Sequence, residues 1–482
     1  MKAFMASKLF PSLLIGLSAL SLFLAGCTNG DPSLTQAAET QQVQTPSVTP
    51  KPRISPTPSP TPLFNLSKSD LEGRQIVVWH PWSGQTGDVL KSLAEEFNQS
   101  NEWGITVSLA QQGSSMVLAQ NISAQIGSAA LPQVVIAPSD DLLLWHRQAD
   151  LLLPLNDLVT DAQWGFTEQQ RADFPLVFWQ LDQDDGIQIG IPMQRTTTAI
   201  YYNQTWAAEL GFRSAPASTE EFQAQACAAA EANNNDASRD NNGTGGWIVE
   251  TNGDTIYAWT RAFGLTSPFK GDPLKLSLEQ PATRKAFEYL RGLVDQGCAW
   301  TSGLTEADED LFAERRALFF TADLRDLPQV SSAMQRAGSG DEWTILPFPG
   351  PDKPTVVVSG LSYGILAGSP ENNLAAWIFI RWMNQTDREL KLLEAGGGLP
   401  VSTSAIQAAD DYRTQYPQWG QAIQWMPYAA ATPNSELWAS ARLVLGDAAW
   451  QALQSYLPAD QIPAILSQLD DTIYEINAQG GQ

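Results

Sequence analysis

The side chains of this sequence that are best suited to binding a ligand are its tryptophans and its acids. Seventeen tryptophans and 52 aspartates and glutamates occur in 482 residues. A tryptophan more often fills a core, but its flat face also binds a sugar ring or a cation. Two suitably spaced carboxylates hydrolyse glycosidic bonds. The acids are numerous, but no spacing in the sequence picks out such a pair. A glycosidase using paired carboxylates therefore stays the alternative to ligand binding without catalysis.

Other kinds of catalytic and metal-binding site have little support. Only two histidines occur, His80 and His146, which argues against a histidine-based zinc or non-haem iron site. The sequence has neither the G-x-S-x-G motif of serine hydrolases nor a G-x-x-x-x-G-K-[ST] phosphate loop. The segment that begins at Asp240 resembles a calcium loop, but Thr251 stands where its final acid is expected. We expect no metal and no cofactor, with calcium at Asp240 as an open alternative.

The net charge of −24 limits the partners that the chain can bind. Nucleic acids need clustered Lys and Arg, and an anionic membrane surface repels a strongly acidic protein. We therefore expect no nucleic acid, and partners that are neutral.

The N-terminal segment predicts export. Lys2 and Lys8 precede an almost wholly apolar run over residues 9–25, which ends in Leu24-Ala25-Gly26-Cys27. This layout is typical of a signal peptide, and its end resembles the lipobox of bacterial lipoproteins. We predict a signal peptide over residues 1–26 and lipidation of Cys27, which anchors the chain to the membrane. The alternative is an uncleaved transmembrane helix, for which the run is slightly short.

Residues 27–71 predict a spacer, because the stretch TPSVTPKPRISPTPSPTP favours extended polyproline conformations. The two other cysteines, Cys227 and Cys298, are an even pair in an exported chain and predict a disulfide. Two separate buried thiols are the alternative.

Strands and helices alternate from about residue 72 onward. Short apolar runs at 75–79 and 134–136 predict strands, as does the alternation of apolar residues over 105–109. Leu90, Leu93 and Phe97 recur at helical spacing. We expect Ser139 and Asp140 to cap the helix that follows the third strand. Residues 356–358 and 364–366 predict two further strands. This order predicts an α/β fold with mostly parallel strands.

Several segments together resemble one family. They are IVVWHPWSG (76–84), GSAALPQVVI (127–136), GIQIGIPMQRTTTAIYYN (186–203), WTILPFPG (343–350), SGLSYGI (359–365) and GGLPV (397–401). In order and spacing they resemble the extracellular solute-binding proteins of ABC importers, in the carbohydrate-binding group that includes maltose-binding protein. Gln133 stands where that family commonly has Asp. The resemblance covers about residues 73–475.

The resemblance implies a periplasmic-binding-protein-like fold of two α/β lobes, joined by hinge strands, with a ligand cleft between them. It implies a first lobe from residues 72–190 and 321–384, and a second lobe from residues 191–320 and 385–482. The implied partners are a sugar ligand and the permease subunits of an ABC transporter, and the implied state is a monomer. The sequence leaves the solute open among a disaccharide, a longer oligosaccharide, a sugar alcohol and a glycerol phosphate.

The resemblance also implies which side chains face the ligand. Trp82 is a stacking candidate with local packing as its alternative, and core packing is the alternative for Tyr257 and Trp259. Asp140 has helix capping as its alternative. The full set of implied ligand-binding residues is Trp82, Ser83, Asp140, Asp141, Arg195, Thr197, Tyr257, Trp259, Asp323, Gly360, Tyr363 and Trp438.

Overall fold

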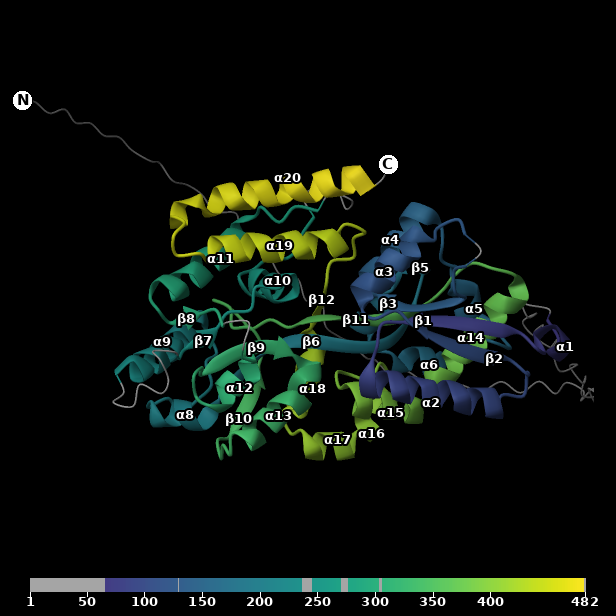
Figure 1. Ribbon diagram of the computed structural model, residues 1–482, viewed down its shortest axis with the longest axis horizontal. Coiled ribbons are helices and arrows are strands. Elements are labelled where there is room, and N and C mark those ends of the chain that lie inside the picture. Colours follow the sequence, from purple (N-terminus) through teal and green to yellow (C-terminus); the bar gives the residue numbers. More distant parts are fainter. Residues whose placement is uncertain (1–65, 129, 236–244, 270–275, 303–305, 481–482) are drawn as a thin grey trace, which may run out of the picture. The chain divides into compact units, whose positions relative to one another are not determined.

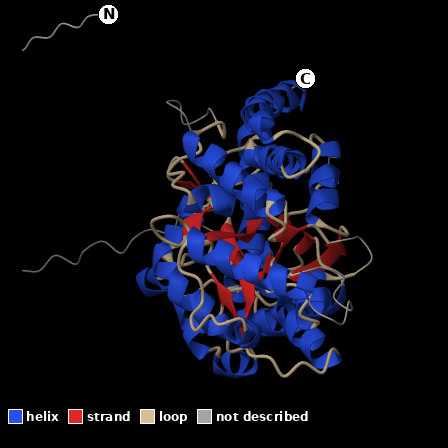
Figure 2. Ribbon diagram, turned by 90° about the vertical axis from the view of Figure 1, so that its left-hand side faces the viewer, coloured by secondary structure: helices blue, strands red, loops and turns tan. Residues whose placement is uncertain are grey.

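The computed structural model describes residues 66–128, 130–235, 245–269, 276–302 and 306–480. The predicted signal peptide over 1–26, Cys27, Asp240 and residues 27–65 of the predicted linker lie outside these ranges. Helices cover both sides of a central sheet, which Figure 2 shows running through the interior. This arrangement confirms the predicted α/β class.

The ten-stranded sheet has the order β2-β1-β3-β11-β6-β9-β7-β8, with β10 beside β6 and β12 beside β11. Its strands are β1 (Gln75–His80), β2 (Thr106–Gln111), β3 (Val134–Pro138), β6 (Ile191–Asn203), β7 (Trp247–Ile248), β8 (Ala299–Trp300), β9 (Phe319–Asp323), β10 (Trp343–Leu346), β11 (Val357–Ile365) and β12 (Ala430–Ala431). A separate hairpin joins β4 (Gln183–Asp184) to β5 (Ile187–Gln188).

Two long strands, β6 and β11, cross the middle of the sheet side by side (Figure 1). Residues 191–197 of β6 pair with β11, and residues 198–202 pair with β9. Both pairings are antiparallel, as is that of β11 with β3, so the expectation of mostly parallel strands is wrong for the centre of the sheet. The predicted strands at 356–358 and 364–366 are the two ends of the single strand β11.

The helices follow the chain in this order: α1 (Lys68–Leu71), α2 (Gly84–Ser100), α3 (Ser115–Ala124), α4 (Ser139–Ala149), α5 (Asn156–Thr160), α6 (Glu168–Asp173), α7 (Leu176–Gln180), α8 (Gln204–Glu209), α9 (Thr219–Asn235), α10 (Gly253–Ala262), α11 (Pro281–Asp295), α12 (Asp308–Ala313), α13 (Leu327–Arg336), α14 (Pro370–Met383), α15 (Thr386–Gly396), α16 (Thr403–Ala408), α17 (Asp410–Gln415), α18 (Trp419–Trp425), α19 (Trp438–Ala452) and α20 (Ile462–Gly480). Among the described residues, no helix is long and apolar enough to cross a membrane.

One core lies where α2 and α14 pack against β1 and β3. Phe97 of α2 meets Phe379 of α14 with 5.2 Å between the ring centroids. Leu71, at the end of α1, is fully buried in this core. Residues 66–71, which the sequence assigns to the linker, therefore include a helix that packs on the folded part.

A second core lies at the other end of the sheet, among α9, α10, α11, α19 and α20. Figure 1 shows α19 and α20 side by side along this end. A disulfide between Cys227 of α9 and Cys298, just before β8, fastens this core. This bond confirms the predicted disulfide and excludes the alternative of two separate buried thiols.

The second crossing between the two ends of the sheet comes later than the sequence suggests. β9 pairs with β7, and β10 pairs with the last part of β6, so residues 319–346 stay with the second end. The chain returns to the first end only through β11, and α14 and α15 then contribute to the first core. The return segment is therefore closer to 357–396 than to the expected 321–384.

Candidate functional site

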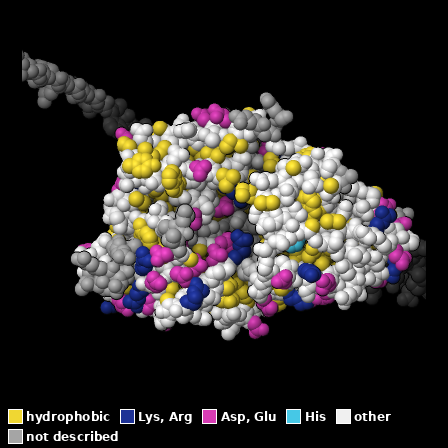
Figure 3. Space-filling model, viewed as in Figure 1, with side chains coloured by type: hydrophobic (Ala, Val, Ile, Leu, Met, Phe, Trp, Pro, Cys, Tyr) yellow, Lys and Arg dark blue, Asp and Glu magenta, His cyan; other side chains and the backbone are white. Residues whose placement is uncertain are grey.

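A cavity of about 1140 Å³ is lined by residues from both ends of the sheet. Figure 3 shows a hollow near the centre of this face, with acidic and basic side chains within it and along its margin. Its lining comes from the loops after β1 and β2, the start of α4, the strands β6 and β11, the loop before α10, and α19. The cavity therefore lies where the two crossing strands bring the halves of the chain together.

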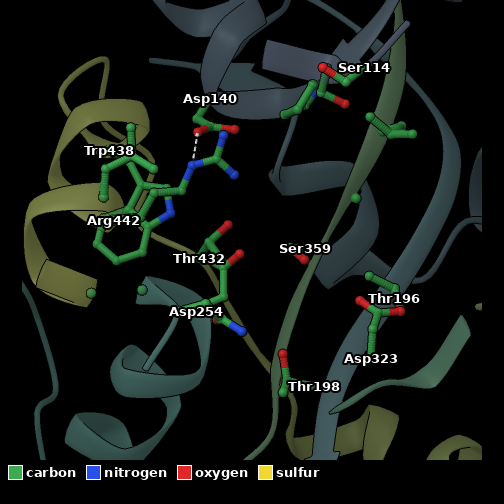
Figure 4. Close-up of a pocket in the computed structure, with 18 of the residues that line it drawn as sticks. Ser114, Asp140, Thr196, Thr198, Asp254, Asp323, Ser359, Thr432, Trp438 and Arg442 are labelled. Carbon is green, nitrogen blue, oxygen red and sulfur yellow. Dashed lines mark hydrogen bonds and ion pairs between the residues drawn. The ribbon is translucent and has the colours of Figure 1, made fainter. Parts of the chain in front are cut away.

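The floor of the cavity is polar because of the alternation of side chains along the crossing strands. Thr196 and Thr198 of β6 face the cavity, together with Ser359 of β11 (Figure 4). The hydroxyl of Thr196 donates to Asp323 Oδ1 at 2.5 Å. Arg325 Nε donates to the same oxygen at 2.8 Å, so this carboxylate is held in one orientation.

An ion pair spans the opposite wall. Arg442 Nε of α19 lies 3.6 Å from Asp140 Oδ2 of α4, and Figure 4 shows the two groups facing each other. Among the described residues, neither of these two atoms has a hydrogen-bond partner. Asp140 occupies the first turn of α4, where the helix dipole stabilises a carboxylate. Pro138 stands at the N-cap, so the predicted cap at Ser139 and Asp140 is wrong.

The charges around Arg442 are partly shielded from water. The Asp140 carboxylate raises the pKa of Arg442. Burial raises the pKa of Asp254 to about 6, against the opposing charge of Arg442. Burial, and then the nearby charge of Asp140, raise the pKa of Asp141 to about 8. Asp141 is only 5% exposed and does not line the cavity.

Two glycines bring the loop before α10 against α19. A Cβ atom on Gly253 would collide with the backbone carbonyl of Arg442, and one on Gly446 would lie 2.8 Å from the carbonyl of Thr251. Side chains larger than hydrogen would push the two elements apart. This close approach places Asp254 beside Arg442.

Three tryptophans line the cavity: Trp82 in the loop after β1, and Trp438 and Trp450 on α19. Trp82 is partly exposed and also borders two adjoining cavities of about 470 and 760 Å³. Trp438 is 1% exposed and meets Tyr257 edge to face, with 4.9 Å between centroids. Trp438 therefore serves both the core and the cavity wall, whereas Trp82 packs against the first core and stays partly exposed at the cavity.

Half of the residues expected from the sequence line this cavity. They are Trp82, Ser83, Asp140, Asp323, Gly360 and Trp438. The others, Asp141, Arg195, Thr197, Tyr257, Trp259 and Tyr363, are buried and do not line it. Successive side chains of a strand point to opposite faces. Because Thr196 and Thr198 face the cavity, Arg195 and Thr197 face away from it.

Arg195 forms a fully buried ion pair instead of a ligand contact. Its Nη2 lies 2.6 Å from Asp182 Oδ2, and both side chains have no exposed surface. Tyr257 and Trp259 belong to the second core, and Tyr363 to the first. For these three aromatic residues, core packing replaces the expected ligand contact.

Sequence reasoning missed Arg442, Asp254, Ser359 and Trp450, which all line the cavity. A signal existed for two of them. Arg442 follows Trp438 by four residues, which places both on one face of a helix. Asp254 precedes Tyr257 at the start of a helix whose first turn favours an acid.

Comparisons with known proteins give one consistent picture. The family model described as bacterial extracellular solute-binding protein matches residues 92–419. The chain is 21% identical over 358 residues to the sn-glycerol-3-phosphate-binding periplasmic protein UgpB of Rhizobium meliloti, covering 72% of this chain and 80% of that one.

Two solved structures share the fold. One is the sugar-binding protein MalE from Xanthomonas citri, with a TM-score of 0.70 at 17% identity, covering 84% of this chain and 98% of that one. The other is UgpB from Mycobacterium tuberculosis in complex with glycerophosphocholine, with a TM-score of 0.65 at 20% identity, covering 84% of this chain and 98% of that one. At these identities the likeness establishes the two-lobed α/β fold.

Proposed function

Because this chain belongs to the bacterial extracellular solute-binding proteins, we propose that it captures a sugar or oligosaccharide and delivers it to an ABC importer. The cavity between the two halves of the sheet is the proposed binding site. The homologues are substrate-binding proteins and not enzymes. The bound sugar is therefore released unchanged.

The composition of the cavity wall carries this proposal. Hydroxyl groups of Thr196, Thr198 and Ser359 and the carboxylates of Asp140 and Asp323 are spread around one space. A sugar offers many hydroxyls, each of which donates and accepts hydrogen bonds, and its C–H faces stack on aromatic rings. Trp82 supplies a partly exposed ring at the same site.

The charges favour a neutral sugar over a phosphate, which is the ligand class named for some relatives. Two arginines line the cavity, and each already faces a carboxylate: Arg442 faces Asp140, and Arg325 faces Asp323. Glu250, Asp254 and Asp447 add three more acids to the wall. A phosphate would therefore meet an excess of negative charge.

A thermal-shift experiment tests the ligand class, because a ligand that binds only the folded state raises the melting temperature. The purified protein is screened against neutral mono- and oligosaccharides, sugar alcohols, sn-glycerol 3-phosphate and glycerophosphocholine. We expect stabilisation by a neutral sugar and recovery of that sugar intact. Stabilisation by the phosphate compounds alone would contradict the proposal, and cleavage of the sugar would favour a glycosidase.

The proposal includes a lipid anchor at Cys27 that holds the protein on the outer side of the cell membrane. It rests on the basic start, the apolar run and the Leu24-Ala25-Gly26-Cys27 ending of the N-terminal segment. Cys27→Ser should move the protein from the membrane fraction to the soluble fraction. A variant that stays with the membranes after a salt wash would contradict lipidation.

A further inference from the structure

One helix, α19, lines the cavity along most of its length. Trp438, Arg442, Gly446 and Trp450 follow one another at intervals of four residues, and all four line the cavity. At a rise of 1.5 Å per residue, Trp438 and Trp450 lie about 18 Å apart along the helix axis. The wall is therefore longer than a single sugar ring needs.

The two aromatic ends of this wall differ in exposure. Trp438 is 1% exposed, whereas Trp450 is 51% exposed. The neighbours Ala448, Ala449 and Ala452 are buried, so they fix the helix backbone while the indole of Trp450 stays open to water. Covering an exposed aromatic side chain with a ligand removes apolar surface from water and so stabilises the complex.

Polar groups accompany the exposed indole. Asp447 precedes Trp450 by three residues on α19, and Glu250 precedes Thr251 in the loop that packs against Gly446; both acids line the cavity. An aromatic face with carboxylates beside it matches a sugar ring, whose flat face is apolar and whose rim carries hydroxyls. The cavity volume of about 1140 Å³ also exceeds the range of about 300–1,000 Å³ that is usual for sites of drug-sized ligands.

We propose that Trp450 is an outer stacking platform, and that the ligand is an oligosaccharide long enough to reach it from the Trp438 end of the cavity. This inference rests on the proposed function. It adds a requirement on ligand length: short sugars occupy the inner part of the cavity, and only longer ones gain the contact with Trp450.

Calorimetric titration of matched variants tests the proposal. The probes are series of neutral oligosaccharides of one to five units, built from glucose in α-1,4 and β-1,4 linkage, from xylose and from mannose. Wild type is compared with Trp450→Ala, with Trp450→Phe, which keeps an aromatic face, and with Tyr456→Ala. Tyr456 is 72% exposed and does not line the cavity, so its variant controls for loss of a surface aromatic ring.

We expect wild-type affinity to rise with chain length in the series that binds. Trp450→Ala should bind the longest members about tenfold more weakly, as for an aromatic contact worth about 1.4 kcal/mol, and should leave the shortest binder unaffected. Trp450→Phe should recover most of the loss, and Tyr456→Ala should match wild type.

Three results would overturn this inference while leaving the proposed function intact. They are an affinity that does not depend on length, an equal loss for all lengths in Trp450→Ala, and unchanged binding with reduced uptake by cells. The last would assign Trp450 to contact with the transporter. Binding of none of the sugars would instead refute the proposed function itself, and this inference with it.

Discussion

The buried ion pair between Arg195 and Asp182 allows a direct test of whether Arg195 stabilises the fold or contacts the ligand. Arg195 directly precedes Thr196, which lines the cavity, yet its guanidinium is fully buried and points away from the cavity. Nη1 donates to the carbonyl of Leu361 and the hydroxyl of Ser362 at 2.9 Å each, and Nη2 donates to the carbonyl of Phe178 at 2.8 Å. We predict that Arg195→Met destabilises the fold without a direct effect on ligand affinity.

The size of the effect follows from the burial of both groups. Removing one partner of a buried ion pair costs about 3–5 kcal/mol, because the other charge is left uncompensated. Here Asp182 would keep hydrogen bonds from Ser139 and Ser362, which places the loss toward the lower end of that range. The total free energy of unfolding of a protein is typically about 5–15 kcal/mol, so the loss is a large part of it.

Urea unfolding of four proteins measures this: wild type, Arg195→Met, Asp182→Asn and the double variant. The double variant should lose less than the sum of the two single losses, because neither charge is then left alone. Arg284→Met is the control, since its pair with Glu288 is about half exposed and should be worth only about 0.3–0.5 kcal/mol. Unchanged unfolding of Arg195→Met, combined with loss of sugar binding by the folded protein, would refute the structural role.

Three further variants test the site and the fold. Trp82→Ala should weaken sugar binding by about 2 kcal/mol and leave the melting temperature close to wild type. Trp438→Ala should weaken sugar binding and also lower the free energy of unfolding by about 3–5 kcal/mol, because that ring is buried. Unchanged sugar affinity of both variants, measured by calorimetric titration, would contradict stacking. Reducing the Cys227–Cys298 disulfide should lower the free energy of unfolding by about 3–4 kcal/mol, measured by urea unfolding with and without reductant. The pKa of Asp254 is raised from 3.8 to about 6, so the folded chain holds this proton more tightly than the unfolded chain. Wild type should therefore lose stability relative to Asp254→Asn as the pH rises from about 4 to about 6, and parallel melting curves across that range would contradict this.

The sequence alone was sufficient for the fold class because apolar runs and helical spacing mark the elements on both sides of the sheet. It failed at the crossing strands. In β11, Ser359 and Ser362 interrupt the apolar pattern, so one strand resembles two. The position of the second crossing depends on packing between segments that are distant in the chain, such as Tyr201 with Trp343, whose ring centroids lie 5.8 Å apart. Local patterns carry no record of such contacts.

The candidate site was predictable where a residue lies at the end of a strand or just after it, as Trp82, Asp140 and Asp323 do. Within strands the prediction depended on which face a side chain occupies. Thr196 and Thr197 have the same side chain and are neighbours, but only Thr196 lines the cavity. An error of one residue in the face assignment exchanges a ligand contact for a core contact. Arg195 was misplaced for this reason.

The two crossing strands also limit how this protein can be divided experimentally. β3 and β11 are hydrogen-bonded neighbours although more than 200 residues separate them, and β6 contributes its first part to the first core and its last part to the second core. A fragment that ends anywhere between β6 and β11 would leave unpaired strand edges, which promote aggregation. A soluble version of the first half alone would need residues 66–197 fused to residues 357–396, so deletion mapping by successive truncation is unsuited to locating the binding determinants of this chain.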